Sequence, residues 1–109
     1  MNYNIELSDH FKKEAKRLIK KYRSLKSDLA GLFDELEQNP TLGTPLGSDV
    51  FKIRLAIESK GKGKRGSARV ITYVKIDETI VLLLSIYNKG EKDNISDKEI
   101  LELLEKYAK

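Results

Sequence analysis

The chain has 109 residues, no cysteine and a formal net charge of +4. This length predicts a single domain over residues 1–109 with its own core, and the absence of thiols excludes disulfides, cysteine nucleophiles and zinc–thiolate sites. The N-terminus lacks the apolar segment of a secretory signal, and the longest apolar run, residues 80–84, is too short to span a bilayer. We therefore expect a cytoplasmic protein without membrane contact.

The first half of the chain predicts one strand and two helices. Residues 3–7 alternate between polar and apolar side chains, which is typical of a strand at a sheet edge. Ser8 can cap a helix whose apolar stripe spans residues 11–22, and a second stripe spans residues 25–36. The two stripes share one spacing, so the helices can pack as a hairpin on one face of a sheet. Residues 41–49, rich in Gly and Pro, are expected to form a loop.

Three apolar runs follow, at residues 51–57, 68–76 and 79–87. Runs of this length with turn residues between them predict an antiparallel meander. The third run is apolar on both faces, so we expect it at the centre of the sheet. Residues 96–107 begin with a capping box and predict a last helix. The expected fold is therefore α+β, in the order β-α-α-β-β-β-α, with a small antiparallel sheet and an N-terminal helical hairpin on one face.

The segment that joins the first two runs of the meander is strongly basic. The stretch from Lys60 to Arg69 contains five cations and no acid, at Lys60, Lys62, Lys64, Arg65 and Arg69. Like charges this close repel one another, so a polyanionic partner would favour the arrangement. The alternative is a solvated hairpin loop. Residues 61–66 also match G-x-G-x-x-G, but a strand follows where a dinucleotide site needs a helix, so we reject that interpretation.

A second group of cations is predicted on one sheet face. Lys52 and Arg54 point the same way from one strand, and Arg69 joins them if the register of the next strand allows it. Tyr73 adds an aromatic ring, and Lys89 follows the third strand. Cations beside a tyrosine suit phosphate and a stacked base. The alternative is that these are ordinary exposed strand residues.

Other kinds of chemistry find little support. His10 is the only histidine, which excludes an acid–base mechanism with two histidines in one chain. The acids of residues 91–99 suit a turn and a helix N-terminus rather than a metal site. We therefore expect neither a metal nor a cofactor.

Three segments of the chain resemble the RelE/ParE superfamily of toxins from bacterial toxin–antitoxin systems. They are FKIR at residues 51–54, GKGKRGSARVITY at residues 61–73 and SIYNKGEKDNIS at residues 85–96. The chain is most similar to the RelE/HigB-type branch of mRNA interferases. The fold of that family, a small antiparallel sheet with a helical hairpin on one face, agrees with the predicted elements. Ser67 and Leu55 depart from the family pattern, which has a glycine and an aromatic residue there.

This resemblance implies a ribosome-dependent endoribonuclease that uses no metal and in which the 2′-hydroxyl attacks the adjacent phosphate. Lys52 and Arg69 would stabilise the transition state. Arg54 stands where relatives carry a lysine proposed as base, but a guanidinium almost never loses its proton, so it suits charge stabilisation better. Lys89 would support the leaving group, and Tyr87 would orient or stack the substrate.

The resemblance also implies the partners: a cognate antitoxin, the ribosome and mRNA. The expected RNA-binding residues are Lys60, Lys62, Lys64, Arg65, Tyr73 and Lys92. Two alternatives stay open, a ParE-like toxin that poisons DNA gyrase without cutting RNA, and an inactive member that only binds its antitoxin. Because one fold serves all three, the fold cannot decide between them.

Overall fold

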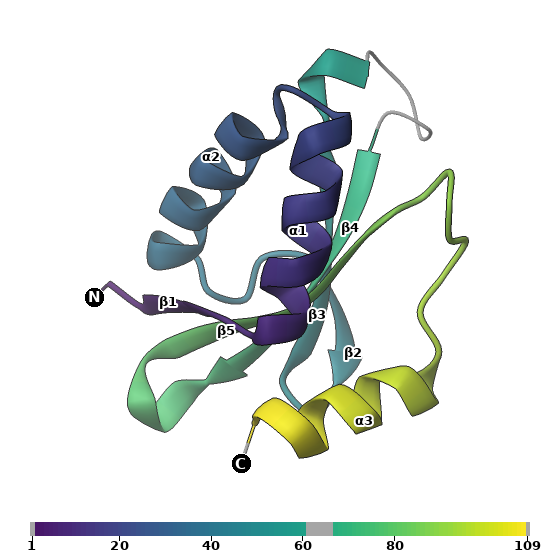
Figure 1. Cartoon of the computed structure of the whole chain (residues 1–109). Helices are drawn as coiled ribbons and strands as arrows, with labels where there is room; N and C mark the ends of the chain where they lie inside the picture. Colours follow the sequence, from purple (N-terminus) through teal and green to yellow (C-terminus); the bar gives the residue numbers. More distant parts are fainter. Residues whose placement is uncertain (1, 61–66, 109) are drawn as a thin grey trace.

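The structure is a computed structural model that describes residues 2–60 and 67–108. The described residues form one sheet of five strands and three α-helices (Figure 1). In chain order the elements are β1 (Asn4–Leu7), α1 (Asp9–Lys21), α2 (Leu25–Gln38), β2 (Thr44–Gly47), β3 (Val50–Ala56), β4 (Ser67–Lys75), β5 (Ile80–Asn88) and α3 (Asp97–Tyr107). None of these helices is both long enough and apolar enough to cross a membrane.

The strand order across the sheet is β1-β5-β4-β3-β2. The three long strands β3, β4 and β5 form the predicted antiparallel meander, with β1 at one edge. The α+β prediction is thus confirmed. The sheet is mixed rather than wholly antiparallel, because β1 pairs with β5 in parallel. The helices α1 and α2 connect β1, at one edge of the sheet, to β2, which is the strand at the opposite edge.

The predicted loop at residues 41–49 is wrong in its middle part, because β2 pairs there with β3 as an edge strand. Pro45 lies opposite Phe51, and the register shifts between Pro45 and Gly47. Proline is tolerated in an edge strand because its missing N–H can lie on the side that faces solvent. The Gly and Pro residues correctly indicated an irregular segment, but their presence led us to miss the short strand within it.

The helical hairpin covers one face of the sheet, as predicted (Figure 1). The Ser8 hydroxyl accepts a hydrogen bond from the Phe11 N–H at 3.0 Å and donates one to the Leu84 carbonyl at 3.1 Å. Ser8 therefore caps α1 and also ties it to β5. Both apolar stripes are buried against the sheet through Phe11, Ala15, Leu18, Leu25, Leu29, Leu32 and Leu36.

The last helix, α3, lies against the opposite face of the sheet (Figure 1). Its predicted capping box is present, because the Ser96 side chain accepts from the Glu99 N–H and the Glu99 side chain accepts from the Ser96 N–H. Ile100 packs with Val50 and Leu84 in a second apolar cluster. The helix covers the part of this face near β2 and leaves the other part open to the residues described below.

Gly43 lies close against the backbone of β3, and we predict that Gly43→Ala destabilises the fold. Gly43 has a φ of +106°, and a Cβ there would lie 2.6 Å from the Lys52 carbonyl oxygen. The expected loss is about 1–3 kcal/mol of unfolding free energy in urea denaturation. Gly31→Ala is the matched control: nothing lies within 4 Å of its Cβ, so this helical substitution should stabilise by about 0.5–1 kcal/mol. If the Gly43→Ala protein is as stable as the parent, the backbone can move the new Cβ away from the Lys52 carbonyl without loss of unfolding free energy, and the prediction is wrong.

Candidate active site

Three side chains that were predicted for the site share one row across the sheet. Arg54 of β3 lies opposite Arg69 of β4, and Arg69 lies opposite Tyr87 of β5. Neighbouring strands are about 4.8 Å apart, so this register brings the two guanidinium groups close together. Lys52 lies one row further along the same face, opposite Ile71. The prediction that Arg54 and Arg69 share a face is confirmed by this pairing.

The guanidinium of Arg69 is held by its own strand. Its Nη1 donates to the Ser67 hydroxyl at 2.6 Å and to the Ala68 carbonyl at 3.4 Å. Ser67 is itself buried, with only 2% of its surface exposed. The serine that departs from the family pattern therefore fixes the direction of the arginine. It lies two residues before Arg69, and the two-residue period of a strand could have revealed the contact.

Among residues 2–60 and 67–108, no carboxylate forms an ion pair with Lys52, Arg54 or Arg69. Other cations of the chain are paired, including Arg17 and Lys21 of α1. A row of cations without counterions attracts an anion such as phosphate, whose oxygens accept from the guanidinium N–H groups.

Tyr87 is a buried member of the row. Only 5% of its surface is exposed, and it packs in the cluster with Ile95 and Ile100. Burial raises the pKa of its hydroxyl, while the charge of Arg69 and a backbone hydrogen bond at Ile95 oppose the rise. The hydroxyl stays protonated near neutral pH. Because so little of the ring is exposed, this conformation suits Tyr87 to orienting its neighbours rather than to stacking a base.

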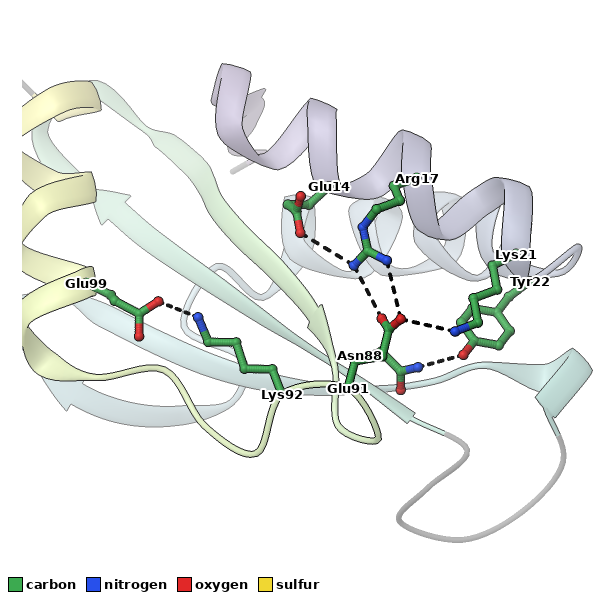
Figure 2. Close-up of polar contacts among 8 residues, drawn as sticks. All are labelled: Glu14, Arg17, Lys21, Tyr22, Asn88, Glu91, Lys92 and Glu99. Atoms are coloured by element: carbon green, nitrogen blue, oxygen red, sulfur yellow. Dashed lines mark hydrogen bonds and ion pairs between the residues drawn. The ribbon is translucent and has the colours of Figure 1, made fainter.

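Two lysines follow β5, and they point in different directions. The Lys89 ammonium donates to the Asp93 carbonyl at 2.7 Å and to its carboxylate at 3.0 Å. The Lys92 ammonium lies 5.9 Å from the centroid of the Tyr87 ring and forms an ion pair with Glu99 (Figure 2). The hydrogen bond from Lys92, followed by the one from the Ser96 backbone, lowers the pKa of Glu99.

The segment that carries these lysines is anchored to α1. Glu91 accepts from both terminal nitrogens of Arg17, at 3.3 and 3.4 Å, and from the Lys21 ammonium at 3.0 Å (Figure 2). Just before it, the Asn88 amide donates to the Tyr22 hydroxyl at 2.6 Å. Part of the basic surface of α1 is therefore used to hold the end of β5 in place.

A cavity of about 370 Å³ opens beside Tyr87. It lies between α1 and α3, and its walls include Glu14, Lys92, Glu99 and Tyr107. Both acids and bases line it, so it is not a second cationic surface. Its position gives solvent and ligands a path to Lys92.

Of the residues predicted for RNA binding, Tyr73 lies away from the row. Tyr73 is opposite Val50 and Leu82, in the part of the face that packs with α3. Lys62, Lys64 and Arg65 lie outside the described residues, as does the side chain of Lys60. Sequence reasoning also missed the pairing of Glu99 with Lys92, because the capping box alone explains a glutamate at that position.

Comparisons with known proteins agree with this architecture. The family model for the "RelE toxin of RelE / RelB toxin-antitoxin system" matches residues 8–109. A mutant of the E. coli toxin RelE in its free state aligns with a TM-score of 0.66 and 16% identity, over 98% of this chain and 99% of that one. The toxin–antitoxin complex RelBE2 of Mycobacterium tuberculosis aligns with a TM-score of 0.61 and 20% identity, over 81% and 99%. The intact E. coli RelBE complex gives 0.60 and 17%, over 79% and 95%.

The anchor at Glu91 makes stability depend on pH. Hydrogen bonds from Arg17 and then Lys21 lower the pKa of Glu91. A carboxylate whose pKa is lower in the folded state stabilises the fold above its unfolded pKa, and this contribution is lost as the pH falls through the folded pKa. We predict that Glu91→Gln lowers the Tm by about 2–4 °C at pH 7, since exposed pairs contribute little.

This difference from the parent should disappear in thermal melts below the folded pKa of Glu91. Glu105→Gln is the matched control, because Glu105 is exposed and forms no ion pair with the described residues. A Glu91→Gln protein whose deficit is the same at acidic and neutral pH would show that the ion pairs are not its cause.

Proposed function

Because this chain belongs to the RelE family of toxins from toxin–antitoxin systems, we propose that it is an endoribonuclease that cuts messenger RNA on the ribosome and so stops translation. The observation that supports this most strongly is the row of Arg54, Arg69 and Tyr87 with Lys52 beside it. Lys52, Arg54 and Arg69 have no acidic partner among the described residues. The guanidinium and ammonium groups of such a row can donate several hydrogen bonds to the oxygens of one phosphodiester.

The chemistry that fits these residues is attack by the 2′-hydroxyl on the adjacent phosphorus. The 2′-oxygen bonds to phosphorus while its proton passes to a general base, and the bond to the 5′-oxygen breaks. That oxygen leaves with the electron pair and takes a proton, so the products are a 2′,3′-cyclic phosphate and a 5′-hydroxyl. Lys52, Arg54 and Arg69 stabilise the extra negative charge on the phosphoryl oxygens. Arg54 does not act as the base, because a guanidinium keeps its proton.

The same surface supports the proposed partners. Two of the structures that this chain resembles are complexes of a toxin with its antitoxin. We propose that a cognate antitoxin with an acidic segment binds the present chain and covers the unpaired cations. Complementary charge would speed association and would exclude mRNA from the same surface.

We predict that Arg69→Ala slows mRNA cleavage in a purified ribosome assay about 10²–10³-fold, which is the usual effect of losing one contact to transition-state charge. Lys75→Ala is the matched control, because Lys75 lies on the same face of β4 at its other end, opposite Ile80. It should cleave at nearly the parental rate.

Expression in cells gives the corresponding result: the parent and Lys75→Ala arrest growth, and Arg69→Ala does not. If Arg69→Ala cuts mRNA as fast as the parent while remaining folded, the row is not the catalytic site.

A further inference from the structure

We propose that Lys92, held in place by Glu99 of α3, is the cation that acts beside Tyr87 on the leaving-group side of the proposed cleavage site. The inference rests on the proposed function and makes it more specific. It gives this role to Lys92 instead of Lys89, the lysine that the family resemblance suggests. It also gives Glu99, a residue outside the row, the role of a positioning residue.

The first support is the place of the Lys92 ammonium. It lies 5.9 Å from the centroid of the Tyr87 ring, within the range of a cation–π contact. Tyr87 is opposite Arg69 in the register, so Lys92 extends the row of cations by one group beyond β5. Arg69 would then lie on one side of Tyr87 and Lys92 on the other, so that both cations could act on one bound phosphodiester. The adjoining cavity gives access to Lys92.

The second support is the way in which Lys92 is held. Glu99 forms an ion pair with Lys92 and also accepts from the Ser96 N–H and hydroxyl, both at 3.2 Å. The carboxylate is thus fixed by the first turn of α3 before it contacts the lysine. Because the helix itself is packed on the sheet through Ile100, the lysine is positioned relative to Tyr87 by a rigid element.

The contrast with Lys89 supports the assignment. Lys89 donates to the carbonyl and the carboxylate of Asp93, four residues later. The Asp93 side chain is 98% exposed and makes its contact from the same turn. Lys89 therefore closes a local turn, whereas Lys92 bridges this turn to Tyr87 and to α3.

In the reaction, the Lys92 ammonium would meet the negative charge that develops on the 5′-oxygen as the bond to phosphorus breaks. Such an interaction is stronger in the transition state than in the bound substrate, so its loss lowers kcat and leaves KM nearly unchanged. A lysine that only attracted RNA would show the reverse pattern. The split between kcat and KM is therefore the decisive measurement.

The test is a double-mutant cycle with Lys92→Met and Glu99→Gln, measured on ribosomes programmed with mRNA. Glutamine keeps the capping box but removes the charge that holds the lysine. We expect kcat to fall about 10²-fold in Lys92→Met and about tenfold in Glu99→Gln, with little change in KM or Tm. Because Glu99 acts only through Lys92, the double variant should be no slower than Lys92→Met. Lys98→Met, the same change at an exposed site on α3, should match the parent.

Each of the following results would overturn the inference. If Lys92→Met raises KM and leaves kcat unchanged, the lysine only binds RNA. If the effects of the two substitutions on kcat are additive in the double variant, Glu99 does not position Lys92. The same conclusion follows if the loss of kcat in Glu99→Gln is accompanied by a fall in Tm. If the parent itself cuts no mRNA, the proposed function falls together with the inference, whereas a parent that cuts and two variants that match it overturn the inference alone.

Discussion

Two arginines on neighbouring strands lie directly opposite each other, and the site depends on the register that places them so. Like charges in this position are unfavourable by about 0.2–1 kcal/mol. The apolar side of the same strands supplies the compensation, because Ile53, Val70 and Ile86 form the adjacent row on the opposite face and are buried under the helical hairpin. A slip of one residue would expose that row to solvent. The core thus forces the cations together, and an anionic substrate would relieve their repulsion.

The face that carries the arginines is divided between packing and chemistry. Near β2, α3 covers the row in which Val50 lies opposite Tyr73. Toward the start of β4 and the end of β5, Arg54 and Arg69 themselves lie outside the second apolar cluster. The boundary between the two parts is Tyr87, which is buried in that cluster and yet lies beside Arg69. Any partner that moves α3 would therefore disturb the residues next to the proposed site.

The sequence was sufficient for the elements whose signals are local. Apolar spacing and the capping residues Ser8 and Ser96 predicted the helices, and alternation predicted the meander. The register was not predictable, because alternation fixes which face a residue occupies but not its partner on the next strand. The burial of Tyr87 was missed for a related reason: the apolar pattern of a strand does not indicate whether a helix or a substrate covers it. The pairing of Lys92 with Glu99 depends on where α3 docks, which no local pattern specifies.

In the proposed function, the row of Arg54, Arg69 and Tyr87 serves the cleavage of messenger RNA by its own 2′-hydroxyl. The most direct test is to isolate transcripts after brief expression of the protein in cells and to determine the position and the chemistry of their new ends. The account predicts cuts inside translated reading frames, with a 5′-hydroxyl on one fragment and a 2′,3′-cyclic phosphate on the other. Fragments with 5′-phosphates would contradict the mechanism, and intact transcripts together with arrested DNA replication would contradict the function and point to gyrase.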